Sequence, residues 1–188
     1  MLKDLVQKNR SYRRFHQDKP ITEETLLELV ELARLSPSAR NAQPLKYFIS
    51  TDQASNDKIF PHLSWAGYLK EWAGPVKGEQ PSAYIVVLND TEISSNYFCD
   101  DGIATQSILL GAVEKELGGC IIGSLNRLQL LRELQLPSHL KIVHVIALGH
   151  PKEEVKLEEM KENDHRYWRD VQETHHVPKR ALNDIIVK

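Results

Sequence analysis

The stretch from Tyr97 to Leu117 constrains the fold most, because it has the length of a helix and is apolar on most of its sides. A helix with a single apolar stripe lies at the surface, whereas a helix that is apolar all round is buried. The apolar positions of this stretch include Ile103, Ala104, Ile108, Leu110, Ala112 and Val113. We therefore expect a buried central helix, ended by Gly118-Gly119 as a C-cap.

Other segments of the chain predict a sheet around this helix. Short apolar runs, the pattern of buried strands, are found at Lys46–Ser50, Ala83–Leu88, Cys120–Ile122 and Leu140–Leu148. Further helices are expected at Leu2–Lys8, after an N-cap at Thr22, and at Asn126–Leu134. This pattern predicts an α+β fold, with a sheet of four to five strands flanked by helices, in one domain over residues 1–188.

Two regions do not fit the central sheet. Residues 56–78 mix Pro, Gly and Lys with Trp65 and Trp72 and have only a weak helical period, so we expect a mobile excursion that carries aromatic side chains. The part of it from residue 61 to 78 is a possible substrate lid, although aromatic packing in a dimer explains it about as well. Residues 152–188 begin polar and charged and regain apolar character at Ala181-Leu182 and Ile185–Val187.

Composition excludes several classes of function. The chain has 188 residues, of which 41% are hydrophobic and 27% charged, the range of globular proteins and not of disordered ones. A net charge of −2 gives no field that would attract nucleic acid or an anionic membrane. Two cysteines make no disulfide framework, and no apolar run has the length of a membrane span or a signal peptide, so we expect a cytoplasmic protein.

Common catalytic motifs are missing. The chain has no GxGxxG and no GxxxxGK[ST] loop, no GxSxG nucleophile elbow and no HExxH pair. His175 and His176 are adjacent and point in different directions along an extended chain, so we expect no metal site. The sequence therefore favours neither a hydrolase nor a metalloenzyme.

An arginine cluster near the start of the chain is the first candidate for a binding site. Arg10, Ser11, Arg13 and Arg14 place three guanidiniums and a hydroxyl within five positions, which suits a phosphate dianion. A solvated basic linker explains the same residues about equally well. Pro178-Lys179-Arg180, at the other end of the chain, is a second cationic element that could converge on the same phosphate.

The loop from Pro37 to Pro44 is the second candidate. Proline and serine after a helix are ordinary stop signals, and they account for Pro37 and Ser38. They do not account for Asn41 and Gln43, whose amides can donate to and accept from the edge of a heteroaromatic ring, with the small Ala39 allowing close approach.

The segment Gly119–Gly123 is the third candidate. Its glycine pair is explained by the end of a helix, and Cys120 by burial as a small apolar residue. Gly123, at the end of the strand, would permit close contact with a bound ring. We expect no catalytic thiol, because no basic residue is next to Cys120 in the sequence.

Taken in order, these elements resemble the FMN-dependent nitroreductase family. That family shows R-S-x-R-x-F, P-S-A-x-N-x-Q-P, a glycine-cysteine strand after a long buried helix, and P-K-R-x-L near the C-terminus. The matching segments are Arg10–Phe15, Pro37–Pro44, Gly119–Gly123 and Pro178–Leu182. Each match is weak alone, but four in the same order are specific.

The resemblance implies a nitroreductase-like fold with a mostly antiparallel sheet, and a homodimer with FMN at the subunit interface. Arg10, Ser11, Arg13, Lys179 and Arg180 would hold the FMN phosphate and ribityl chain. The ring would contact a loop from the other subunit and the end of the glycine-cysteine strand. The residues implied at the ring are Pro37, Ser38, Ala39, Asn41, Gln43, Ile122 and Gly123. Residues 152–188 would form an arm that reaches the partner.

The resemblance also implies the chemistry. NADH or NADPH would pass hydride to flavin N5, and a nitroaromatic, a quinone or a similar small acceptor would then take the electrons in a ping-pong reaction. No side chain would be catalytic, because the flavin performs the chemistry. Leu45 and Ile121 stand where many members have tryptophan, which leaves the acceptor open. The alternatives are a dehalogenase-type enzyme on the same fold, with Lys70 and Glu71 as candidate substrate contacts, and a flavin-binding or redox-sensing protein without turnover.

Overall fold

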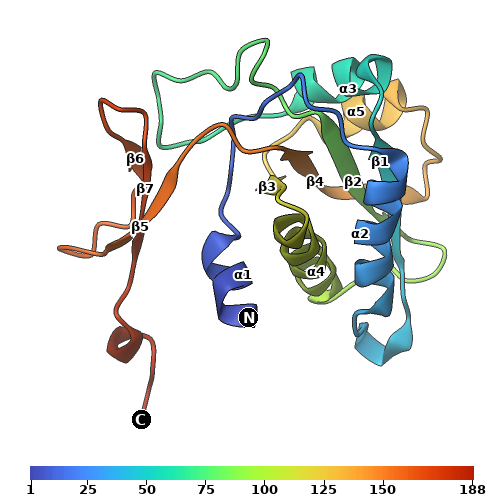
Figure 1. Ribbon diagram of the computed structural model, residues 1–188. Coiled ribbons are helices and arrows are strands. Elements are labelled where there is room, and N and C mark those ends of the chain that lie inside the picture. Colours follow the sequence, from blue (N-terminus) through green and yellow to red (C-terminus); the bar gives the residue numbers. More distant parts are fainter.

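The computed structural model describes residues 1–188 and contains two sheets. The central sheet has four strands, all antiparallel to their neighbours, in the order β1-β2-β4-β3. Their bounds are β1 Leu45–Ser50, β2 Ala83–Asp90, β3 Gly118–Ile122 and β4 Leu140–Gly149. The α+β class and the antiparallel sheet predicted from the sequence are thus confirmed (Figure 1).

Helices cover both faces of this sheet. Alternate residues of β2 point to opposite faces, and every one of its residues is buried, which explains why its sequence is an almost continuous apolar run. Ile85 and Val87 pack in one core with α2 (Glu23–Leu35) and α4 (Asp100–Glu114). Tyr84, Val86 and Leu88 pack in a second core with α3 (Gln53–Ile59) and α5 (Arg127–Glu133).

The first two helices match the sequence predictions. α1 spans Leu2–Lys8, and α2 starts after Thr22, whose hydroxyl accepts a hydrogen bond from the Thr25 backbone N–H at 3.2 Å. α2 ends at Leu35, before the proline that was expected to stop it. No helix of the protein is both long enough and apolar enough to span a membrane.

The predicted role of Gly118-Gly119 was wrong. α4 ends at Glu114, and Glu116 takes the left-handed conformation after it with φ of 60°. Both glycines belong to β3, where they allow close packing: a Cβ on Gly118 would lie 2.5 Å from the ring of Tyr12, and one on Gly119 would lie 2.6 Å from Leu109. The glycines are needed by neighbours that are distant in sequence, which a local pattern does not reveal.

The region 56–78 was also only partly predicted. Its first residues belong to helix α3, which is capped by Asp52 through a 2.9 Å hydrogen bond from the Ser55 backbone N–H. A short 3-10 turn follows at Phe60–His62, and residues 63–78 run without helix or strand. The expected excursion therefore starts later than predicted.

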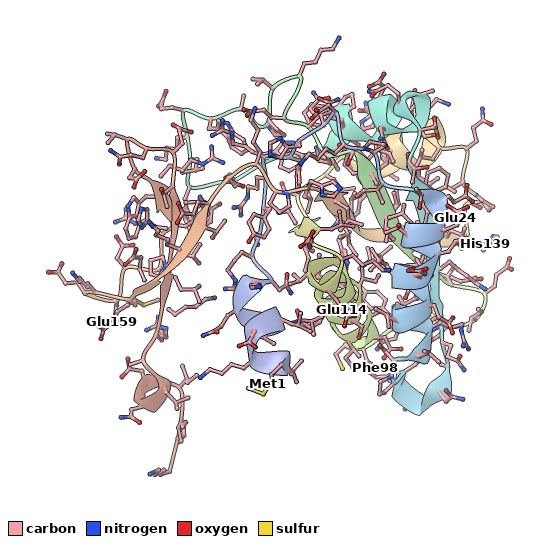
Figure 2. All side chains as sticks on the ribbon, in the orientation of Figure 1. Met1, Glu24, Phe98, Glu114, His139 and Glu159 are labelled. Carbon is pink, nitrogen blue, oxygen red and sulfur yellow. The ribbon has the colours of Figure 1, made fainter.

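The C-terminal region contains a second, three-stranded sheet that the sequence did not predict. Its strands are β5 Val155–Glu159, β6 Trp168–Arg169 and β7 His175–Lys179, in the order β5-β7-β6. β5 is parallel to β7, and β6 is antiparallel to it. Figure 1 shows this second sheet set apart from the central one, with α1 between them and the C-terminal tail pointing away from both. Figure 2 agrees, because Glu159 of β5 and Glu114 of α4 lie on opposite sides of Met1.

Candidate functional site

A hollow of about 320 Å³ lies where the N-terminal segment meets the second sheet. We call it the cationic hollow. Its lining residues come from the segment after α1, from α4, from β3 and from the C-terminal arm: Asn9, Arg10, Ser11, Arg13, Gln106, Leu109, Gly119, Ile121, Tyr167, His175, Val177 and Lys179. The two cationic elements from opposite ends of the chain therefore meet in one place, as the sequence suggested.

The charges of the hollow suit an anion. Arg10, Arg13 and Lys179 line it, and no carboxylate does. Two buried nitrogen atoms among the lining residues, Arg10 Nε and His175 Nδ1, have no hydrogen-bond partner in the protein. Burial lowers the pKa of Arg10, as expected for a cation with little compensation nearby. Buried donors without acceptors are costly, so the residues present fit a dianionic group such as a phosphate.

The arginine segment is held by a buried carboxylate. Glu153, only 8% exposed, accepts hydrogen bonds from the backbone N–H groups of Arg13 and Arg14 and, at 2.8 Å, from Arg169 Nη2. On the other side, the Tyr12 backbone N–H donates to the Gly119 carbonyl of β3 at 3.0 Å. The segment is therefore fixed between the central sheet and the arm before any ligand binds.

The Arg13 guanidinium lies against the arm. Its Nη1 donates to the Ser11 carbonyl at 3.2 Å and lies 3.2 Å from His175 Nε2. Its carbon lies 4.8 Å from the centre of the Tyr167 ring, a cation–π distance. Neither Tyr167 nor His175 was predicted as a site residue, because only the unpredicted second sheet brings them to Arg13.

Arg14 is turned away from the hollow. Its guanidinium makes a bidentate pair with Glu79, with Nε–Oε2 at 2.7 Å and Nη2–Oε1 at 2.8 Å, and Nη1 contacts Glu173 at 2.9 Å. This pairing lowers the pKa of Glu79 to about 2. Arg14 is thus neutralised within the protein, and only two of the three clustered arginines face the hollow.

Of the other residues predicted from the sequence, some line the hollow and others point away from it, because side chains alternate along a strand. Lys179 lines it, whereas Arg180, the next residue, donates to Asn163 Oδ1 at 3.0 Å and does not. In β3 the side chain that faces the hollow is that of Ile121, which is 49% exposed, and Ile122 is buried in the second core. Gly123 is exposed at the end of β3, and its carbonyl accepts from Arg127 Nη2 at 2.9 Å.

The Pro37–Pro44 loop is fixed by a buried aspartate at the start of α4. Asp100, 4% exposed, accepts from Ser38 Oγ at 2.6 Å and from the Ala39 backbone N–H at 2.8 Å. Ser38 Oγ in turn accepts from the Gln43 backbone N–H at 2.9 Å. Arg40, Asn41 and Gln43 all take left-handed φ values, of 55°, 54° and 52°. Three such residues in one short loop are costly, and conformations of this kind cluster at functional sites.

This loop lines a second hollow, of about 560 Å³, which we call the loop hollow. Pro37, Ser38 and Gln43 contribute to it, whereas Ala39 and Asn41 do not. Its apolar lining residues are Leu27, Val30, Ala33, Leu45, Tyr47 and Ala104. Burial and the charge of Asp100 raise the pKa of Tyr47 to about 12. The loop hollow and the cationic hollow share no lining residue, and no hydrogen bond joins residues 10–13 to residues 37–43.

The aromatic part of the excursion packs on the arm. The rings of Tyr68 and Tyr167 are 5.0 Å apart at 63°, and Tyr68 Oη lies 3.0 Å from His165 Nε2. Trp72 lies under the Arg169 guanidinium at 4.3 Å. Residues 63–78 are therefore connected to the arm that completes the cationic hollow.

Burial also decides the role of Cys120. Its side chain lies in the second core, and burial raises the pKa of its thiol. The Arg13 guanidinium, distant in sequence, lies near this thiol and partly offsets the effect of burial. A thiol whose pKa is raised is a poor nucleophile.

Comparison with known proteins places this geometry in a family. Residues 6–150 match the model of the nitroreductase family. A protein of Archaeoglobus fulgidus, provisionally named an NADH dehydrogenase/NAD(P)H nitroreductase, is 29% identical over 149 residues, which is 75% of this chain and 80% of that protein. An iodotyrosine deiodinase of Thermotoga neapolitana is 28% identical over 170 residues, 80% of this chain and 89% of the relative.

A solved structure from Desulfovibrio desulfuricans, crystallised in complex with FMN, superimposes with a TM-score of 0.67 at 27% identity. The superposition covers 80% of this chain and 86% of the other. The family match ends at residue 150, so the arm with Lys179 and His175 lies beyond it.

Proposed function

Because this chain belongs to the nitroreductase family, we propose that it is an FMN-dependent oxidoreductase that takes electrons from NADH or NADPH. The electrons would pass to a nitroaromatic, a quinone or a similar small acceptor. The observation that carries the proposal is the cationic hollow: three cations, no carboxylate, and two buried nitrogens without partners.

Four residues would hold the FMN phosphate within one chain. Arg10, Arg13 and Lys179 supply charge, and Ser11 supplies a hydroxyl at the same hollow. Arg180 belongs to this group on the family motif alone, because its guanidinium contacts Asn163 in this structure. The bound FMN would supply the hydride acceptor, at N5 of its ring.

The ring end of the cofactor would need a second subunit. Pro37, Ser38, Ala39, Asn41 and Gln43 are the loop residues proposed there, with the backbone of Ile122 and Gly123 at the end of β3. The separation of the loop hollow from the cationic hollow supports a site completed by the partner's loop.

Uncovered apolar side chains support the same homodimer. On α1, Leu2 is 67% exposed, and on α4, Ile103 is 36% exposed although that helix is apolar on most sides. The C-terminal tail exposes Leu182, Ile185, Ile186 and Val187. We propose that a partner subunit covers these side chains and that the arm over residues 152–188 reaches that partner.

The test is an anaerobic reduction. The purified protein is saturated with FMN, its visible spectrum is recorded, and NADH or NADPH is added without oxygen. We expect a yellow protein whose flavin absorbance bleaches and then recovers when a quinone or nitroaromatic is added. A protein that takes up no FMN contradicts the proposal, and a yellow protein that neither nicotinamide reduces indicates flavin binding or sensing without turnover.

A second candidate, reductive dehalogenation, is favoured by two observations. A relative of 28% identity is named an iodotyrosine deiodinase, and this chain has the polar side chains of Lys70 and Glu71 between Tyr68 and Trp72. The same FMN-loaded protein, chemically reduced, would release iodide from an iodotyrosine if this alternative holds. No iodide release, with quinone turnover intact, excludes it.

A further inference from the structure

His175 is the one histidine that lines the cationic hollow. We propose that it is a positioning residue, which holds Arg13 so that one edge of the guanidinium is free for the phosphate of the cofactor. This inference rests on the proposed function, and it adds a residue of the arm, beyond the part of the chain that matches the family model.

The placement of His175 follows from strand alternation in β7. His175, Val177 and Lys179 share one face of the strand and line the cationic hollow. His176 and Pro178 point to the other face, where His176 stacks on Trp168 at 5.0 Å. The side chain of His175 therefore points into the cationic hollow, next to Arg13.

Hydrogen-bonding capacity decides the direction of the contact between them. A guanidinium has only donors, so at 3.2 Å Arg13 Nη1 donates and His175 Nε2 accepts. An imidazole that accepts at Nε2 is neutral and carries its proton on Nδ1. Burial, helped by the charges of Arg13 and Arg169, lowers the pKa of His175 to about 4, which keeps the ring neutral at physiological pH.

Arg13 has two nitrogen atoms, Nε and Nη2, that remain available to a ligand. Nη1 contacts the Ser11 carbonyl and His175, while Nε and Nη2 donate to no oxygen or nitrogen atom of the protein. The Arg13 side chain also lies close to the Cys120 thiol, which is a weak acceptor. Nε and Nη2 together form the edge with which a guanidinium makes two parallel hydrogen bonds to a phosphate. The contact with His175, together with the Tyr167 ring 4.8 Å away, selects the rotamer that leaves this edge free.

Losing the contact between His175 and Arg13 should affect only ligands that carry a phosphate. Riboflavin has the ring and the ribityl chain of FMN but no phosphate, so it would not use the free edge of Arg13. A loss of the acceptor at His175 should therefore weaken FMN binding and leave riboflavin binding nearly unchanged.

The experiment compares two substitutions in the full-length protein. His175→Leu removes both the Nε2 acceptor and the Nδ1 donor and leaves an apolar side chain of similar bulk. His175→Gln restores an acceptor oxygen near the position of Nε2 and places no donor at the position of Nδ1, so it rescues binding only if the acceptor toward Arg13 is what matters. Dissociation constants for FMN and for riboflavin are measured by quenching of flavin fluorescence. We expect His175→Leu to weaken FMN about tenfold and riboflavin less than about twofold, and His175→Gln to stay within about threefold of the wild type for both.

A matched control uses another partly buried histidine. His139 lies on the side of the molecule opposite Glu159 of the second sheet (Figure 2), and His139→Gln should change neither dissociation constant. An equal loss of FMN and riboflavin in His175→Leu indicates a merely structural role and overturns the proposal. So does FMN binding of wild-type strength in that variant.

A measurement without flavin separates this inference from the proposed function. Nitrogen-15 NMR of the unliganded protein at neutral pH should show His175 protonated at Nδ1 only, with the Nε2 signal shifted by Arg13→Ala. A charged His175, or one protonated at Nε2, contradicts the positioning role whether or not FMN binds. Failure of the wild type to bind FMN contradicts the proposed function instead.

Discussion

Replacing Glu153 should destabilise the protein far more than replacing its exposed neighbour Glu154. Its side chain is fully buried and accepts from two backbone N–H groups of the arginine segment and from Arg169, itself only 9% exposed. Glu153→Leu removes all three acceptor contacts at once. Arg169 would keep only Glu173, at 4.0 Å, as a counter-charge.

The contacts of Glu153 set the size of the expected destabilisation. Breaking a buried ion pair by removing one partner costs about 3 to 5 kcal/mol, because the other charge stays buried. Each backbone N–H left without a partner costs about 1 to 3 kcal/mol, and these costs overlap because the segment can relax. We expect Glu153→Leu to lower the free energy of unfolding by about 4 kcal/mol or more, a large part of the stability of an ordinary domain, about 5 to 15 kcal/mol. Glu153→Gln, which keeps one acceptor, should cost about 1 to 3 kcal/mol.

The assay is urea unfolding followed by circular dichroism, with the neighbouring glutamate as control. Glu154 is 65% exposed and pairs only with Lys156, at 3.3 Å, so Glu154→Gln should change the free energy of unfolding by less than about 1 kcal/mol. Arg169→Leu should partly rescue Glu153→Leu, since the double variant leaves no unpaired buried charge. A loss below about 1 kcal/mol in Glu153→Leu, or no rescue in the double variant, would show that Glu153 does not compensate a buried charge.

The remaining predictions concern the cofactor, the second sheet and β3. Arg13→Ala should weaken FMN binding at least tenfold and riboflavin binding little, with the fold intact by circular dichroism; unchanged FMN affinity would remove Arg13 from the phosphate site. Both ring nitrogens of His176 contact carboxylates, Glu158 at 2.6 Å and Asp170 at 3.1 Å, and these contacts raise the pKa of His176. The stability that the charged ring contributes is therefore present below its ordinary pKa and is lost as the pH rises through the raised pKa. Unfolding measured from about pH 6 to 9 should show this loss in the wild type and not in His176→Phe. Gly118→Ala should cost about 1 to 3 kcal/mol in urea unfolding, because the new Cβ would lie 2.5 Å from an aromatic carbon; a neutral effect would show that the ring moves freely.

The central sheet could be predicted from the sequence because its strands are buried. Ala83–Leu88 and Leu140–Leu148 are apolar runs whose burial leaves few other structures open, and both are strands in the structure. The helix after Thr22 was predicted from its cap and its apolar period, which are local signals. Elements decided by local sequence were thus found with nearly correct bounds.

The second sheet could not be predicted, because it depends on contacts between distant and mostly polar segments. β6 has only two residues, and β5 pairs with a strand about 20 residues further along the chain. Gly118 and Gly119 were misassigned for a similar reason, since their neighbours Tyr12 and Leu109 come from other parts of the chain.

The residues of the candidate site also fall into two groups: those predicted from the sequence and those that only the folded chain brings to the hollow. Arg10, Arg13 and Lys179 were selected from residue type and spacing, and the structure brings them to one hollow. Tyr167 and His175 have no motif of their own. His175 reaches the hollow because side chains alternate along β7, and Tyr167 reaches it because it directly precedes β6 of the same sheet. Only the three-dimensional structure shows that these two residues belong to the hollow.

A crystal structure of the protein with FMN would locate the cofactor phosphate directly. We expect a phosphate bound in the cationic hollow, within hydrogen-bond distance of Arg10, Arg13 and Lys179, with the ring reaching toward the end of β3 and a loop of a second subunit. A phosphate bound elsewhere, or an FMN seated in the loop hollow of a single chain, would contradict this expectation.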